Sequence, residues 1–183
     1  MSRSSVSRLA LAVVLACLAV APACAAETGA VSLFVQGGVG EQSVHVASLG
    51  AAWGLPWHNL TGGITTRLEV FASDWSTPSV DGGRRSLVQV GVVPTVRLRP
   101  GQGRSPWFVD VGIGVSLLDR ELVMPERRFS TRLNFSDNLA LGRSFGARET
   151  EEVSLHVQHT SNAGIRTPNP GLDLVMLRYA HNF

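Results

Sequence analysis

The fold is decided by residues 107–117, which read WFVDVGIGVSL. Every second residue from Trp107 to Leu117 is large and apolar, and the residues between them are Phe, Asp, Gly, Gly and Ser. Successive side chains of a β-strand point to opposite faces. The alternation therefore predicts a strand with one apolar face and one face that is mostly polar or glycine.

The same alternation continues on both sides of this stretch, where clusters of Gly, Pro, Asp and Asn separate the apolar runs. Such clusters are typical of turns between strands. We therefore predict eight strands, at residues 31–40, 43–53, 64–75, 86–99, 107–119, 129–146, 152–161 and 173–183.

The faces of these strands distinguish a membrane barrel from a soluble β-sandwich, which could also alternate with its apolar face inward. Charged residues such as Arg67, Glu69 and Arg97 lie opposite the apolar residues, as in a barrel that is apolar outside and polar inside. We predict an all-β fold at residues 26–183, an eight-stranded antiparallel transmembrane β-barrel of the bacterial outer membrane. The even strand number places both termini in the periplasm, and Phe183 resembles the C-terminal aromatic of such barrels. Ion pairs are expected inside the barrel among Arg67, Glu69, Arg97, Asp110 and Arg178.

The first 25 residues have the pattern of a cleaved signal peptide: Arg3 and Arg8, an apolar Leu/Ala/Val run, and Ala23-Cys24-Ala25 at the cleavage site. A lipoprotein signal through Cys24 is the alternative, although Ala21 stands where a Leu is usual. The formal net charge of +2 comes from this segment, because the remainder has fourteen Arg, no Lys and fourteen Asp or Glu. This balance argues against nucleic-acid binding, which normally needs a basic surface.

The last predicted hairpin contains a serine, a histidine and a carboxylate on the apolar parity of its strands. His159 and Ser161 follow Val157, and Asp173 precedes Val175. A simple hairpin sets His159 nearly opposite Asp173, with Cβ atoms about 4.5–5.5 Å apart. Asp173 stands out as the chief charge on the outer wall. Polar side chains in that position are costly, so we interpret Ser161 as a nucleophile, His159 as its base and Asp173 as the orienting acid.

Backbone and side-chain donors follow the serine directly. Asn162 and the N–H groups near Gly164 are candidates for stabilising an oxyanion.

His156 and His159 have a metal-like spacing, but in a strand they point to opposite faces, so no metal site is predicted. Arg127 and Arg128 lie in a connection and are expected to be solvated. Arg166, at the rim, could contact phosphates.

The segment HTSNAG at residues 159–164, followed by PNPG at 168–171 and an acid at 173, resembles the C-terminal motif of the outer-membrane lipid A 3-O-deacylases, the PagL family. The resemblance implies hydrolysis of the ester at position 3 of lipid A in the outer leaflet, with catalytic His159, Ser161 and Asp173 and no cofactor. It also implies substrate or oxyanion roles for Asn162, Gly164, Asn169 and Phe135. Family members often carry Glu where this chain has Asp173.

Two other functions remain open from the sequence. One is a non-catalytic barrel, structural or adhesive, like small OmpA-type domains. The other is transfer of the acyl chain to another lipid by the same three residues. The protein is expected to be a monomer or a homodimer, and the sequence does not distinguish the two.

Overall fold

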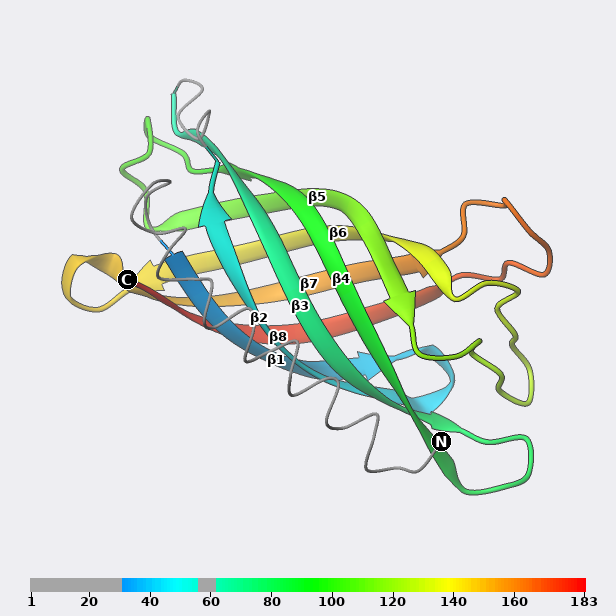
Figure 1. Cartoon of the computed structure of the whole chain (residues 1–183). Helices are drawn as coiled ribbons and strands as arrows, with labels where there is room; N and C mark the ends of the chain where they lie inside the picture. Colours follow the sequence, from blue (N-terminus) through cyan, green and yellow to red (C-terminus); the bar gives the residue numbers. More distant parts are fainter. Residues whose placement is uncertain (1–30, 56–61) are drawn as a thin grey trace.

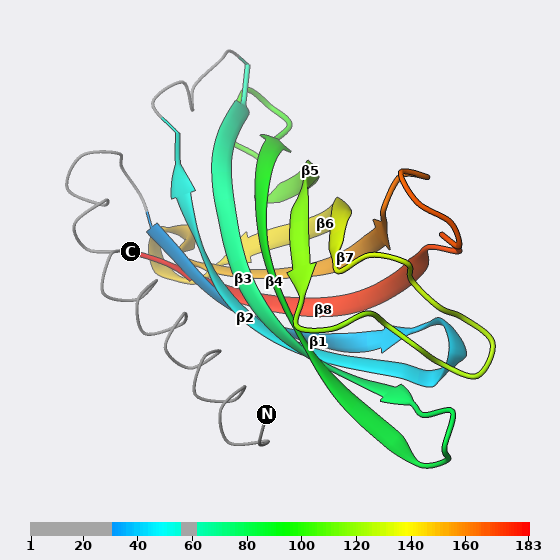
Figure 2. The same ribbon diagram turned by 45° about the vertical axis from the view of Figure 1, so that its right-hand side comes forward.

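The computed structural model describes residues 31–55 and 62–183, which form one closed β-barrel (Figures 1 and 2). Each strand is antiparallel to the next, and β1 closes the barrel by pairing with β8. The strands are β1 (Val31–Gly40), β2 (Val44–Gly54), β3 (Ile64–Pro78), β4 (Arg84–Leu98), β5 (Trp107–Leu118), β6 (Leu133–Phe145), β7 (Glu151–Ser161) and β8 (Leu172–Asn182). Two short 3₁₀ turns are η1 (Glu41–Ser43) and η2 (Ala147–Glu149). The predicted fold class is confirmed.

The predicted signal peptide, residues 1–25, lies outside the described residues and stays a prediction. Within the described part of the chain, no helix has the length and apolar character needed to cross a membrane.

The predicted strand bounds hold within three residues everywhere except at the start of β6. Residues 129–132 were expected in this strand, but they belong to the β5–β6 connection (residues 119–132). The Phe129 N–H donates to the Leu122 carbonyl at 2.9 Å, and Phe129 is buried. The prediction was wrong because an apolar residue that turns inward from a connection continues the alternation of the strand that follows.

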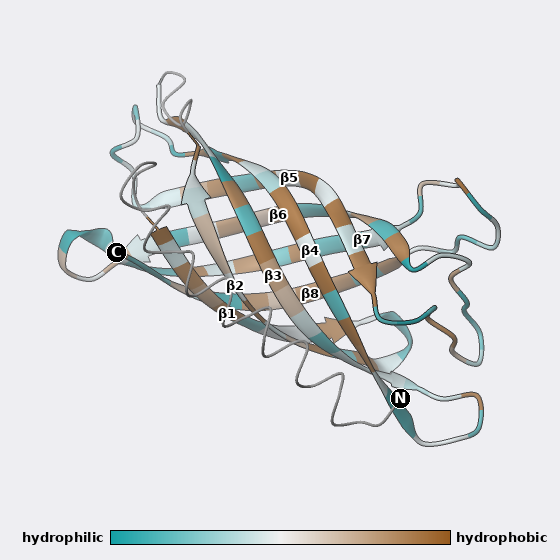
Figure 3. Ribbon diagram, viewed as in Figure 1, coloured by the Kyte–Doolittle hydropathy of each residue, from teal (hydrophilic) through white to brown (hydrophobic). Residues whose placement is uncertain are grey.

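Hydrophobic and hydrophilic residues alternate along the strands (Figure 3), and burial sorts them by face: large apolar side chains are exposed on the outer wall, whereas the charged side chains of the strand centres are buried inside. On β5, Val111 and Ile113 are 44% and 67% exposed, whereas Asp110 is 3% exposed. The apolar residues of this strand are thus exposed on the outer wall, where a bilayer would cover them.

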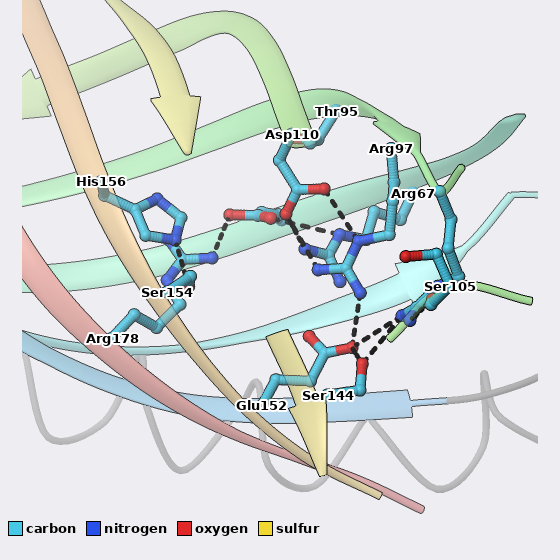
Figure 4. A network of polar contacts seen from close by, with 12 residues as sticks. Arg67, Thr95, Arg97, Ser105, Asp110, Ser144, Glu152, Ser154, His156 and Arg178 are labelled. Carbon is cyan, nitrogen blue, oxygen red and sulfur yellow. Dashed lines mark hydrogen bonds and ion pairs between the residues drawn. The ribbon is translucent and has the colours of Figure 1, made fainter. Parts of the chain in front are cut away.

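The interior charges form a network of ion pairs that crosses the lumen (Figure 4). Arg97 Nε lies 2.8 Å from Asp110 Oδ1, and Arg178 Nη1 lies 2.8 Å from Glu69 Oε2. Buried charges are tolerated only when they are paired. The predicted interior ion pairs are confirmed, and the network consists of Arg67, Glu69, Arg97, Arg99, Asp110, Glu152 and Arg178.

One end of the barrel is filled by apolar side chains, which we call the mouth cluster. The connections that follow β1, β3, β5 and β7 lie at this end, opposite the C-terminus (Figure 1). Leu172 and Leu174 of β8 are fully buried in the cluster, so Asp173 between them must point outward. The cluster consists of Val44, Val46, Trp75, Leu87, Leu118, Leu122, Met124, Phe129, Leu172, Leu174 and Met176.

Candidate active site

The β7–β8 hairpin brings His159 and Asp173 together on the outer wall, at the end that holds the mouth cluster. The two residues are direct register partners. The His159 and Asp173 side chains are 45% and 59% exposed, so a molecule in the surrounding leaflet or at its surface can reach them.

The His159 imidazole is held by the carboxylate of Asp173. His159 Nδ1 lies 2.6 Å from Asp173 Oδ1. With the ring neutral, Nδ1–H donates to the carboxylate, which leaves the lone pair of Nε2 free to accept a proton. This is the arrangement in which an acid fixes the tautomer of a general base and stabilises the imidazolium that forms.

Ser161, the last residue of β7, has the same parity as His159 and is 9% exposed. Its Oγ accepts a hydrogen bond from the Ala163 N–H at 3.4 Å. Within the described part of the chain, Ser161 Oγ and His159 do not hydrogen-bond to each other. The structure thus joins base and acid, with the serine two residues away. Contacts of this kind often tighten only when substrate binds.

The three motif residues of the β7–β8 connection (residues 162–171) bond within this connection and, through Asn162, to the β5–β6 connection. The Asn162 N–H donates to Asn169 Oδ1 at 2.9 Å, and the Gly164 N–H donates to Asn162 Oδ1 at 3.0 Å. Asn162 Nδ2 donates to Ser130 Oγ and to the Arg166 carbonyl. These contacts fix the turn after Ser161, in which Ala163 and Gly164 have φ angles of 51° and 77°.

The neighbouring strand β6 adds two residues to the outer wall beside the site. Phe135 pairs with Ser161, and Asp137 pairs with His159. Phe135 is half-buried, which is compatible with its expected place beside the substrate. Asp137 was missed, and its parity with Phe135 could have revealed it. Asp173 is therefore not the single carboxylate at this position of the wall.

Gly171 was also missed, although it stands in the quoted PNPG segment. Its φ is +66°, and a Cβ added there would lie 2.7 Å from His159 Cε1. The imidazole therefore packs directly against the backbone of residue 171, and any side chain would displace it. Only glycine fits both the conformation and the contact.

Two charged residues from other connections reach the site, and neither was expected there. Glu41 of η1 accepts the Asp173 N–H at 3.2 Å and also pairs with Arg127. Arg127 was predicted to be solvated, but its side chain is only 16% exposed and donates to the Gly171 carbonyl at 2.7 Å. The hydrogen bond from Arg127, followed by the one from the Asp173 N–H, lowers the pKa of the Glu41 carboxyl. The prediction that Arg127 is solvated was wrong, because the contacts of a residue in a connection cannot be read from the local composition.

In residues 31–55 and 62–183, no three His, Cys, Asp or Glu side chains are grouped closely enough to hold a metal ion. His156, two positions beyond Ser154, faces the lumen and is 2% exposed. Its Nε2 lies 2.9 Å from Ser154 Oγ (Figure 4). The barrel thus has one Ser–His pair inside and another serine and histidine outside.

Fold and site together define a class of protein: an outer-membrane type of β-barrel with serine, histidine and carboxylate side chains on its outer wall. The family model for Lipid A 3-O-deacylase (PagL) matches residues 43–182. The chain therefore belongs to the lipid A 3-O-deacylase (PagL) family. This membership confirms the resemblance found in the sequence, and with it the enzyme class, a carboxylic ester hydrolase.

Individual relatives agree with the family model. The chain is 32% identical to the lipid A deacylase PagL of Bordetella bronchiseptica over 133 residues, which cover 69% of this chain and 70% of that protein. It is 29% identical to the lipid A deacylase PagL of Pseudomonas aeruginosa over 169 residues, 91% of this chain and 93% of that protein.

Solved structures support the fold. A crystal structure of the outer membrane enzyme PagL superposes with a TM-score of 0.67 at 22% identity, covering 82% of this chain and 98% of that one. A de novo designed transmembrane β-barrel superposes with a TM-score of 0.53 at 13% identity, covering 86% of this chain and 98% of that one. The fold is therefore that of an outer-membrane barrel.

Proposed function

We propose that this protein is a lipid A 3-O-deacylase, which hydrolyses the ester-linked 3-hydroxyacyl chain at position 3 of lipid A with Ser161, His159 and Asp173. The observation that carries the proposal is the 2.6 Å contact between His159 Nδ1 and Asp173 Oδ1, on the outer wall and two residues from Ser161. The names of the family model and of both curated relatives support the substrate and the reaction.

In the proposed reaction, Ser161 Oγ attacks the acyl carbonyl of lipid A while His159 Nε2 takes the serine proton. Asp173 stabilises the imidazolium through Nδ1. Collapse of the tetrahedral intermediate breaks the ester bond, and the imidazolium returns the proton to the sugar oxygen. A water molecule, activated by His159, then releases the 3-hydroxy fatty acid from Ser161.

The Ala163 N–H is the oxyanion donor in this proposal, because it lies 3.4 Å from Ser161 Oγ, the atom to which the acyl carbon would bond. Asn162, Gly164 and Asn169 support it by fixing the turn, as their hydrogen bonds indicate. A backbone donor held in this way costs no reorganisation when charge develops on the carbonyl oxygen.

The substrate reaches the site laterally from the leaflet, since Ser161, His159 and Asp173 lie on the lipid-facing wall. The acyl chain would run along the wall beside Phe135, which pairs with Ser161. Arg166 is exposed in the β7–β8 connection, and in this proposal it would contact a lipid A phosphate. The connections that follow the odd-numbered strands would then face the cell exterior, and both termini the periplasm. Outer-membrane barrels have their longer connections outside, and the longest described connection, residues 119–132, lies at the site's end.

The test is mass spectrometry of lipid A from cells that produce the wild type, Ser161→Ala or Ser154→Ala. Ser154 is the matched control, because it lies on the same strand, two residues from a histidine, but inside the barrel. We expect loss of one 3-hydroxyacyl chain with the wild type and with Ser154→Ala, and intact lipid A with Ser161→Ala. Unmodified lipid A in all three strains would instead support a non-catalytic barrel.

The same samples distinguish hydrolysis from acyl transfer. Hydrolysis releases free 3-hydroxy fatty acid in the amount lost from lipid A. If the acyl chain reappears on another lipid, the protein is an acyltransferase and the proposed reaction is wrong.

A further inference from the structure

We propose that Glu41 and Arg127 are positioning residues that hold the backbone of residues 171–173 against His159. The inference rests on the proposed function, because it concerns how the base and the acid of that reaction are held. Glu41 lies in η1 and Arg127 in the β5–β6 connection, so each comes from a part of the chain distant in sequence from the β7–β8 hairpin.

The two charged residues hydrogen-bond to the backbone on both sides of Leu172. Glu41 Oε2 accepts the Asp173 N–H at 3.2 Å. Arg127 Nη1 donates to the Gly171 carbonyl at 2.7 Å and to Glu41 Oε2. The β1–β2 and β5–β6 connections therefore meet the β7–β8 hairpin at one carboxylate oxygen and one guanidinium nitrogen.

Both backbone positions held by this pair contact the His159 ring. Asp173 carries the carboxylate that bonds to Nδ1 at 2.6 Å. Gly171 lies so close to the ring that a Cβ there would be 2.7 Å from Cε1. A shift of residues 171–173 would move both surfaces against which the imidazole rests. Misplacement of a catalytic group by about 1 Å can lower a rate about 10²-fold.

Hydrogen bonds of neighbouring residues hold the connections that carry Glu41 and Arg127 in place. Arg127 ends a tight turn in which the Met124 N–H donates to the Arg127 carbonyl at 2.8 Å. Beside it, Gln42 Nε2 donates to Glu126 Oε2 at 3.4 Å, which is a second link between the same two connections. Glu41 is 45% exposed and Arg127 is 16% exposed, so solvent still reaches the ion pair, and ion pairs screened by solvent add little to stability. Its removal should therefore affect the site more than the fold.

The experiment uses the full-length purified protein in detergent micelles, with Glu41→Ala, Arg127→Ala and Glu41→Gln. Two rates are measured: deacylation of lipid A as kcat and KM, and covalent labelling of Ser161 by a small fluorophosphonate. Labelling needs an activated serine but no lipid binding. Rates are normalised to folded barrel, measured by its migration in an unheated gel. The matched controls are Glu121→Ala and Arg128→Ala, because that ion pair lies in the same connection as Arg127 and is exposed.

We expect Glu41→Ala and Arg127→Ala to lower kcat and the labelling rate about tenfold, with little change in KM. Glu41→Gln should recover most of the loss, since its amide oxygen can still accept both donors. The Glu121 and Arg128 variants should match the wild type.

Wild-type kcat and labelling in Glu41→Ala and Arg127→Ala would overturn the inference. So would a raised KM with unchanged labelling, which would make the pair a lipid contact, and so would an equal loss in Glu41→Gln. The wild type and Ser161→Ala in the same assays keep the two proposals apart: if the wild type does not deacylate lipid A, the proposed function fails, and if Ser161→Ala still does, the proposed role of Ser161 fails, whatever the Glu41 and Arg127 variants do.

Discussion

At the scale of single residues, His159 lies between two carboxylates. Asp173 of β8 and Asp137 of β6 are its register partners on the two sides. Only Asp173 is within hydrogen-bond distance of the ring. The Asp173 side chain, one methylene shorter than that of a Glu, is long enough for this contact.

We therefore predict that Asp173→Asn lowers kcat strongly, while Asp137→Asn stays within a few-fold of the wild type. In serine proteases the equivalent substitution costs about 10⁴-fold, because the amide favours the wrong tautomer. Asp173→Glu should keep substantial activity, since it retains the carboxylate. The measurement is kcat for lipid A deacylation. A larger loss in Asp137→Asn than in Asp173→Asn would assign the acid to β6 instead.

Gly171→Ala should lower activity at least tenfold without unfolding the barrel, because its methyl group would displace the His159 ring. Gly83→Ala is the matched control. Its φ is also positive, at +70°, but nothing lies within 4 Å of the added atom. Both variants share the backbone penalty of about 1–2 kcal/mol for a side chain in the left-handed region, so a difference in their kcat values isolates the contact with histidine. Equal kcat values would show that the contact is unimportant.

At the scale of the strand, β8 is oriented by the residues that it buries. Leu174 is fully buried in the mouth cluster, whereas Leu177 is 61% exposed on the outer wall. Leu174→Ala should destabilise the barrel by about 2–5 kcal/mol, the usual cost of a cavity at a buried leucine. Leu177→Ala, the control on the lipid face, should cost less. Urea unfolding in micelles measures both, and equal losses would contradict the assigned faces.

Strands and their faces were predictable because alternation is a local property of the sequence. The pairing of His159 with Asp173 was predictable from a second local property, because a hairpin that is centred in its connection fixes the register of its two strands. Residues 129–132 show where the alternation misleads, because Phe129 continues the apolar alternation of β6 but belongs to a connection and packs into the mouth cluster. Glu41 and Arg127 were beyond prediction, since connections distant in sequence meet only after the barrel has closed.

At the scale of the whole molecule, the proposed orientation places the site at the outer surface of the cell. The chain downstream of Cys24 has no cysteine, so single cysteines report on the side that they face. Asp81→Cys, in the β3–β4 connection, should react with a membrane-impermeant maleimide on intact cells. Arg148→Cys, in η2 at the opposite end, should react only after the outer membrane is opened. The reverse labelling would invert the proposed orientation.

The barrel has two sets of polar side chains, one on its inner face and one on its outer wall. Inside, paired charges such as Arg178 and Glu69 bridge strands across the lumen. Outside, Ser161, His159 and Asp173 lie on an apolar wall. Under the proposed function, an ester within the leaflet would reach them there.

The most direct test of the account is hydrolysis of purified lipid A in H₂¹⁸O by reconstituted wild type, Ser161→Ala and Ser154→Ala. The account predicts that the wild type and Ser154→Ala release 3-hydroxy fatty acid with ¹⁸O in its carboxyl group, and that Ser161→Ala releases none. Release of labelled fatty acid by Ser161→Ala at the wild-type rate would contradict it.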